Sequence, residues 1–263
     1  MADMNLAYSL AGAFVGFLVG LTGVGGGSLM APILILFFGV NPAIAVGTDL
    51  WFAAITKTVG GAIHHRLGSP DWKVVKRLAL GSVPAALGTL LWLALFHDGR
   101  LQSDLLLQLL GVALFLVASL ILLKPRMQAP LRRMRDRMGP SRHGQQLTVT
   151  IAGGAVVGVL VTLTSVGAGA LVAVLLAMIY PLRLNAKSIV GTDIVHAVPL
   201  TLVAAIGHSW LGNSDVWLLA SLLVGSIPGI VLGSLASNRV NDNWVRYALA
   251  AMLVVSAVKM VTA

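Results

Sequence analysis

The hydrophobic pattern of this chain is a series of apolar runs separated by short polar turns. Six of the runs have 18 residues or more, close to the ~20 that a helix needs to cross the hydrocarbon core of a bilayer. Turn residues such as Asn41-Pro42 mark the boundaries between runs. The pattern predicts an all-α integral membrane protein with segments at 6–21, 28–40, 43–64, 78–97, 105–123, 148–163, 168–181, 188–207, 216–236 and 245–262.

The second half of the chain repeats motifs of the first half. Val46-Gly47-Thr48-Asp49 returns as Val190-Gly191-Thr192-Asp193, and Gly81-Ser82-Val83-Pro84 returns as Gly225-Ser226-Ile227-Pro228, both 144 residues later. Such self-similarity indicates a duplicated unit. We therefore expect one membrane domain made of a first repeat at 1–124, a linker at 125–147 and a second repeat at 148–263.

The length of the first two segments predicts that the repeats are inverted. As a single helix, residues 6–40 would reach about 50 Å against a hydrocarbon core of about 30 Å, so the chain must turn back within them. Each repeat then has about five segments, of which the first two form a hairpin broken at a glycine-rich turn. Because five is odd, the second repeat starts on the opposite side of the membrane.

The basic residues support the same topology. Fifteen of the 18 lysines and arginines fall in loops on one side if the repeats are inverted, and such loops are typically cytoplasmic. The loop 66–77 has four basic residues, whereas its repeat partner 208–217 has none. We expect a multi-pass protein of the bacterial inner membrane, with a cytoplasmic linker and both termini in the periplasm.

The net charge of +9 does not point to nucleic acid, because the charges lie in short loops between membrane segments. Within the linker, Met127, Leu131, Met134 and Met138 recur at helical spacing between arginines. This pattern predicts either a helix on the anionic inner leaflet or a solvated basic loop. The expected partners are a small anionic substrate, protons and membrane lipids, and the oligomeric state, monomer or homodimer, stays open.

Two glycine-rich breaks, Leu21–Ser28 and Leu163–Ala170, are the first candidates for a binding site. Backbone that leaves the helix inside a membrane is tolerated only where it is buried in protein or lines a cavity, and helix N-termini favour anions. Close helix packing through small residues is the alternative. We expect the breaks to meet near the midplane and bind an anion, with Ser28 capping the next helix or donating to the substrate. The residues concerned are Thr22, Gly23, Gly25, Gly26, Gly27, Ser28, Thr164, Ser165, Gly167 and Gly169.

Asp49 and Asp193 lie six or seven residues inside apolar segments, each after Gly-Thr. Acids at such depth are costly and mark functional sites, although a carboxylate that caps a helix kink is the alternative. Because a carboxylate repels an anion unless it is protonated or paired, we expect both acids to take part in proton coupling. The preceding Thr48 and Thr192 are expected to contact the substrate.

Lys57 and His196 complete the expected site. Lys57 shares a helix face with Asp49, so it could neutralise that acid or reach the substrate, and a snorkelling lysine is the alternative. His196 lies one turn after Asp193, so the two could pair in a proton relay or the histidine could bind the anion; a satisfied core histidine is the alternative. His64 and His208 fall at segment ends and are assigned to loops.

The sequence lacks the motifs of other function classes. There is no HExxH or Walker A motif, glutamate is absent and so is cysteine. We therefore expect no enzymatic activity, no ATP-driven pump, no cofactor and no metal site.

The glycine-rich break, its weaker copy, the duplicated Gly-Thr-Asp and the basic linker resemble the sulfite exporter TauE/SafE family, over nearly the whole chain. The resemblance implies transport of small sulfur-containing or organic anions, such as sulfite, thiosulfate and sulfonates. The expected function is a secondary transporter with alternating access around a midplane site. An anion channel, or a cation transporter that uses Asp49 and Asp193, are the alternatives.

Overall fold

The computed structural model describes residues 6–22, 26–66, 68–137, 143–181, 183–236 and 242–262. Over these residues the chain forms ten α-helices and one short 3-10 helix, with no strand, which confirms the all-α expectation. The elements are α1 (Leu6–Thr22), η1 (Gly26–Leu29), α2 (Met30–Phe38), α3 (Pro42–Arg66), α4 (Trp72–Phe96), α5 (Ser103–Arg137), α6 (His143–Thr164), α7 (Ala170–Ile179), α8 (Ala186–Trp210), α9 (Val216–Ala236) and α10 (Asp242–Thr262).

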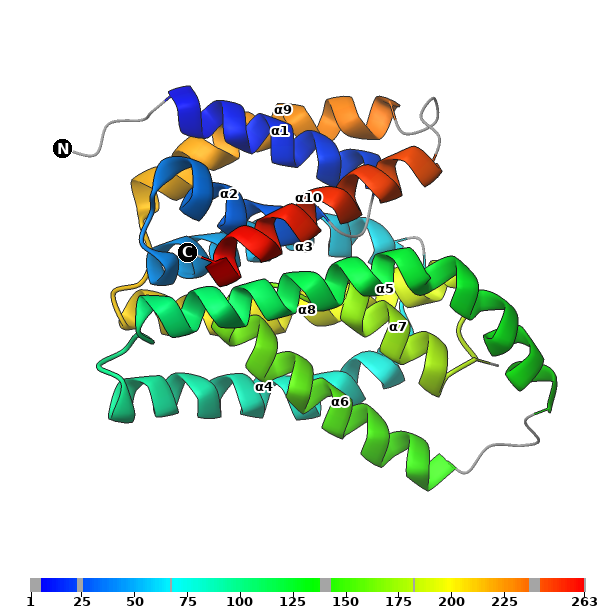
Figure 1. Ribbon diagram of the computed structural model, residues 1–263. Helices are drawn as coiled ribbons and strands as arrows, with labels where there is room; N and C mark the ends of the chain where they lie inside the picture. The colour runs from blue at the N-terminus through cyan, green and yellow to red at the C-terminus, as the bar shows by residue number, and fades with distance from the viewer. Residues whose placement is uncertain are drawn as a thin grey trace.

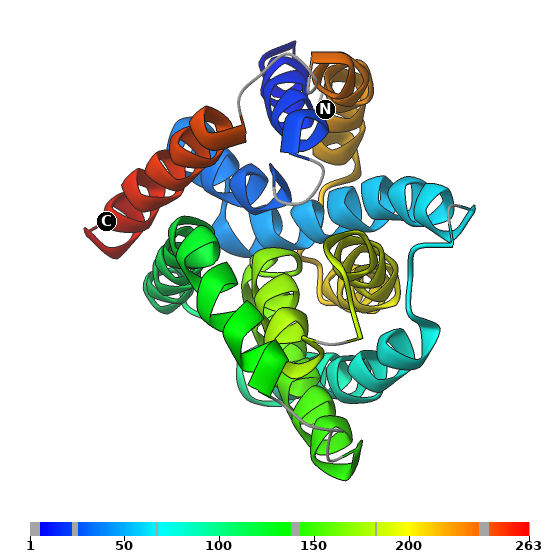
Figure 2. The ribbon, with the colours of Figure 1, turned by 90° about the vertical axis from the view of Figure 1, so that its right-hand side faces the viewer.

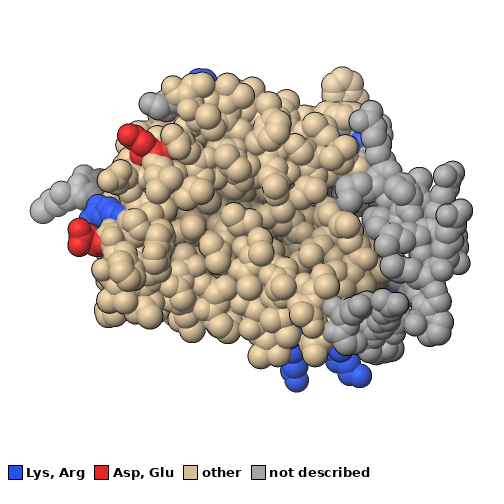
Figure 3. All heavy atoms as spheres, turned by 60° about the horizontal axis from the view of Figure 1, so that its bottom comes forward, with Lys and Arg blue, Asp and Glu red and all other residues tan. Residues whose placement is uncertain are grey.

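Six helices in the described part of the chain are long and apolar enough to cross a membrane. They are Trp72–Phe96, Ser103–Leu123, Gln146–Thr164, Ala186–Trp210, Val216–Ala236 and Trp244–Thr262. Large apolar side chains such as Leu95 and Leu235 point outward and are about 70% exposed (67% and 71%). Figure 3 shows a broad uncharged surface with charged atoms at its edges. An apolar surface of this extent suits contact with lipid, as expected for a multi-pass membrane protein.

Each half of the molecule combines helices from both repeats (Figures 1 and 2). Helices α1, α2 and α3 pack with α9 and α10, and helices α6, α7 and α8 pack with α4 and α5. The two groups meet where α3 lies beside α8 and α5 lies beside α10. Helices α3 and α8 therefore occupy the middle of the bundle, where they carry the candidate site.

Small residues allow the closest helix crossings. A Cβ atom on Gly12 of α1 would collide with the backbone carbonyl of Leu222 in α9, and one on Gly154 of α6 would collide with that of Leu78 in α4. The two contacts are counterparts in the repeats, at offsets of 142 and 144 residues. Membrane helices have little hydrophobic drive to associate, so such close backbone approach is a main source of their stability.

Polar caps in the loops begin several helices. Asp71 accepts hydrogen bonds from the N–H groups of Lys73 and Val74 at the start of α4, and Asn185 accepts one from Ser188 at the start of α8. Ser28, in contrast, does not cap α2 as expected. It lies inside η1, and the residue that precedes α2 is Leu29, which makes no side-chain capping bond.

The linker is helical over residues 125–137, which continue α5 beyond the apolar run, and residues 138–142 with Met138 lie outside the described part. The helical alternative is therefore confirmed over this stretch. Its place on the lipid surface and the division at 1–124, 125–147 and 148–263 stay predictions.

Candidate functional site

The two breaks interrupt their helices in different ways. In the first, Thr22 ends α1, Gly23 and Gly25 lie outside the described residues, and Gly26, Gly27 and Ser28 belong to η1. The second break runs from the end of α6 at Thr164 to the start of α7 at Ala170. Helices α2 and α7 have only 9 and 10 residues, so neither can span the bilayer.

The second break has a compact, left-handed backbone. Ser165 has φ +56° and Gly167 has φ +109°, both in the region that L-residues rarely adopt. The Thr164 hydroxyl accepts a hydrogen bond from the N–H of Val166 at 3.2 Å and donates to the carbonyl of Leu160 at 2.6 Å. Gly169 then donates its N–H to the carbonyl of Gly167 at 2.8 Å and precedes α7. This break is therefore held in one defined shape, although a non-glycine residue is strained in it.

Helix α3 brings Asp49 against the second break and the start of α2. Its carboxyl is fully buried and faces the Ser165 hydroxyl in the second break and the backbone of Ala31 in the first turn of α2. Neither contact meets the geometry of a hydrogen bond, so both carboxylate oxygens lack a hydrogen-bond partner among the described residues. The Ser165 hydroxyl is also buried and likewise lacks a hydrogen-bond partner among the described residues. Unpaired buried polar atoms of this kind are rare and mark a place where a proton, water or ligand is needed.

Lys57 also reaches the second break, two turns further along α3. Its ammonium group donates a hydrogen bond to the backbone carbonyl of Ala168 at 2.5 Å. Lys57 interacts electrostatically with both Asp49 and Asp193, so one half-buried cation acts on two buried acids. The structure thus brings Asp49, Lys57, Ser165 and Asp193 into one neighbourhood between α3, α8 and the second break.

Thr48 and Thr192 both bond to loops. The Thr192 hydroxyl accepts the N–H of Asp71 at 2.9 Å, and the Thr48 hydroxyl accepts the N–H of Asp215 at 3.1 Å. The two contacts are repeat counterparts, and both threonines are fully buried. Their hydroxyls therefore tie each central helix to the loop that precedes α4 or α9.

His196 does not pair with Asp193 as expected. Its Nε2 atom is 2.8 Å from the Ser82 hydroxyl in α4, and its Nδ1 atom has no hydrogen-bond partner in the described part of the chain. Asp193 and His196 are three residues apart and share a helix face, but the His196 ring points toward α4, where Ser82 is its hydrogen-bond partner. Ser82 was not among the residues expected at the site, although the repeated Gly-Ser-x-Pro motif that contains it was a visible signal.

His64 and His208 lie in the last turns of α3 and α8, so the assignment of both to loops is wrong. His208 is buried and contacts the carbonyl of Thr162 through Nε2 at 2.8 Å. His64 contacts the Ser69 hydroxyl at 2.9 Å. Both side chains therefore have polar partners outside their own helices.

Comparisons with known proteins give a consistent family. A family model described as "Sulfite exporter TauE/SafE" matches residues 8–260. The chain is 42% identical to "Probable membrane transporter protein YjnA" of Bacillus subtilis over 98% of this chain and 100% of that protein. It is 28% identical to "Probable membrane transporter protein YdhB" of the same organism over 85% of this chain and 86% of that protein. A "Probable membrane transporter protein" of Xylella fastidiosa is 27% identical over 88% and 84% of the two chains.

No solved structure gives a significant match to the chain. The family model nevertheless spans nearly all of the sequence, including both breaks, both central helices and the linker, and YjnA aligns with 98% of this chain. Together with the six apolar helices and the broad uncharged surface, this match shows that the chain belongs to the sulfite exporter TauE/SafE family and is a membrane transporter.

Proposed function

We propose that this protein is a secondary transporter that moves a small anion across the bacterial inner membrane. The two repeats are inverted and alternate access around a midplane site. The observation that carries the proposal is the contact of Lys57 with the second break, which places a cation beside broken helix ends inside the bundle.

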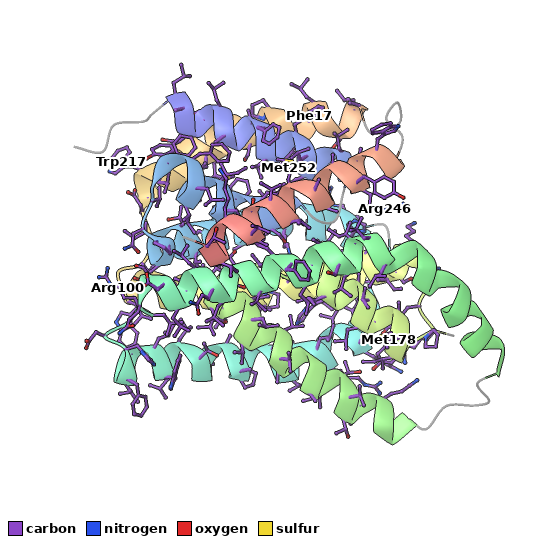
Figure 4. The ribbon with its side chains drawn as sticks, viewed as in Figure 1. Phe17, Arg100, Met178, Trp217, Arg246 and Met252 are labelled. Carbon is purple, nitrogen blue, oxygen red and sulfur yellow. The ribbon has the colours of Figure 1, made fainter. Side chains whose placement is uncertain are left out.

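Reciprocal contacts support the inverted repeats. Helix α1 packs on α9 as α6 packs on α4, and α3 and α8 pack on each other. In Figure 1 the chain enters α1 from the left and α6 from the right. In Figure 4, Arg100 and Arg246 lie at opposite ends of the bundle. With the linker in the cytoplasm, Arg246 lies on the cytoplasmic side, and Arg100 and both chain ends lie on the periplasmic side.

The anion site lies between the two breaks, on Thr22 to Ser28, Thr164 to Gly169, Lys57, Thr48, Thr192 and His196. Helices α2 and α7 begin at the breaks, so their first N–H groups and partial positive charge point into this region. Lys57 adds a full positive charge. A small anion can replace the Ala168 carbonyl as the acceptor for the Lys57 ammonium, because a charged acceptor forms the stronger hydrogen bond.

The family name suggests the substrate class. Sulfite, thiosulfate and small sulfonates carry several acceptor oxygens in a compact shape, which suits a cluster of backbone N–H groups and one ammonium. Asp49 and Asp193 would repel such an anion if both were charged. Protonation of these acids removes the repulsion, so a proton is the natural coupling ion, and no cofactor or metal is required.

The first prediction tests anion binding through Lys57. Sulfite, thiosulfate or sulfoacetate should raise the thermal unfolding midpoint of the purified protein by several degrees, since a ligand at about 100 times its Kd adds about 2.7 kcal/mol to stability. Lys57→Met should remove this increase because the site loses the positive charge that Lys57 supplies. The measurement is a thermal-shift titration in detergent, with chloride as the reference anion.

Lys259→Met is the matched control, because Lys259 is exposed near the end of α10 and far from the breaks in sequence. It should keep the increase. If none of the three anions stabilises the protein, or if Lys57→Met responds as the unmodified chain does, the anion site proposed here is wrong.

A further inference from the structure

A surface depression of about 350 Å³ lies between the α3–α4 loop and the α7–α8 loop. Residues 68–73 form one wall, and Arg183, Leu184 and Ser188 form the other. The first wall belongs to the first repeat and the second wall to the second repeat. The depression therefore lies where the two repeats meet at one end of the bundle.

An ion pair joins the two walls. The Nε atom of Arg183 donates to one carboxylate oxygen of Asp71 at 2.6 Å, and an Nη atom donates to the other at 2.9 Å. Two parallel bonds of this kind fix both distance and orientation. Partial burial acts to raise the pKa of Asp71, but the Arg183 guanidinium and the N–H groups of the α4 cap hold this pKa below its usual range. The pair therefore stays charged at neutral pH.

The candidate site begins directly behind this pair. Asp71 donates its backbone N–H to Thr192, and the neighbouring Ser69 packs so closely on Gly191 that a Cβ atom there would collide with it. The next residue of α8 is Asp193, which is buried. The shortest way along α8 from the depression to Asp193 thus passes the loop that the ion pair holds in place.

The opposite end of the bundle has the same arrangement without the arginine. Asp215 caps α9 and donates its N–H to Thr48, next to Asp49, as Asp71 does in the first repeat. At an offset of 144 residues, the counterpart of Arg183 is Gly39, which has no side chain and adopts a left-handed φ of +63°. Asp71–Arg183 is the only salt bridge found among the described residues. Over the described residues, the two ends therefore differ in this ion pair.

We propose that the Asp71–Arg183 pair is a latch that keeps the path from this depression to Asp193 closed, and that the opposite end has no equivalent latch. The inference rests on the alternating access proposed above. Breaking the pair should shift the population toward the state that is open at this end, whereas the same change at Asp215 should not.

The absence of cysteine makes the test direct, because a single introduced cysteine is labelled without background. Ser165→Cys places a thiol at the second break, where the native side chain is only 8% exposed. A membrane-impermeant maleimide is added to proteoliposomes from the side of the depression, and Lys73→Cys on the exposed wall identifies the correctly oriented vesicles. The initial labelling rate of Ser165→Cys measures how often the path opens as far as the second break, where Lys57 acts on Asp193.

Arg183→Gln and Asp71→Asn should each raise this rate about fivefold, which corresponds to about 1 kcal/mol for a partly exposed pair. Asn retains an oxygen that caps α4, so Asp71→Asn removes the ion pair while the helix start is preserved. Asp215→Asn is the matched control and should leave the rate unchanged. Arg183→Lys keeps the charge without the paired geometry and should give an intermediate rate.

The latch is overturned if both Arg183→Gln and Asp71→Asn label within twofold of the rate of Ser165→Cys alone. An equal increase in Asp215→Asn also overturns it. If one variant fails to fold, the other decides the result, since each removes the pair alone. The assay needs no substrate. Faster labelling without anion binding would contradict only the anion proposal, and anion binding with unchanged labelling would contradict only the latch.

Discussion

Replacing Gly225 by alanine should destabilise the protein strongly, whereas the same change at Gly88 should not. A Cβ atom on Gly225 of α9 would collide with the backbone carbonyl of Ser9 in α1, and this neighbour cannot rotate away as a side chain would. The helices must separate, and overpacking of this kind costs about 1–3 kcal/mol. The expected result is a lower thermal unfolding midpoint in detergent.

Gly88 provides the matched control because it also lies within a helix, α4, yet a Cβ atom there meets nothing within 4 Å. Gly88→Ala should gain about 1 kcal/mol of helix propensity and raise the midpoint. The difference between the two variants therefore separates the α1–α9 contact from the general effect of a glycine in a helix. Equal midpoints would contradict the proposal that close backbone approach stabilises this pair of helices.

The sequence predicted the helices well because a membrane segment can be recognised from its own local composition. A span needs a continuous apolar run, and polar turn residues end it, so segments such as 216–236 agree with the observed helix ends. The duplicated Gly-Thr-Asp likewise marked the segments that became α3 and α8 as carriers of buried acids, and their central position emerged from the packing. These features depend only on neighbouring residues or on self-similarity, which a single sequence contains.

The contacts between helices were less accessible from the sequence. His196 has two potential partners, Asp193 on its own helix and Ser82 on α4, and only the packing of α4 against α8 decides between them. The Asp71–Arg183 pair joins residues 112 positions apart, for which the repeat gives no hint because Gly39 stands at the counterpart of Arg183. Side-chain partners of this kind follow from tertiary packing, which local patterns do not encode.

Asp49→Asn should abolish accumulation driven by a pH difference while anion binding persists. Asp49 is fully buried, and both of its carboxylate oxygens lack a hydrogen-bond partner in the described part of the chain. A charge in that position is costly, so the acid should take up a proton in part of the transport cycle. Asparagine has the same shape but carries no proton, so the anion would cross without being driven by the gradient.

The measurement uses proteoliposomes with an imposed difference of one pH unit and a labelled sulfonate. If one proton moves with each singly charged sulfonate, the unmodified protein should concentrate the anion about tenfold, since one pH unit corresponds to 1.36 kcal/mol. Asp49→Asn should only equilibrate it, while exchange of internal for external anion continues. Asp215→Asn changes an acid that caps α9 outside the buried site and should accumulate the anion normally. Full accumulation by Asp49→Asn would show that this carboxyl group is structural. The coupling proton would then have to bind elsewhere. Asp193 is the next acid to test, because it lies at the same place in the second repeat.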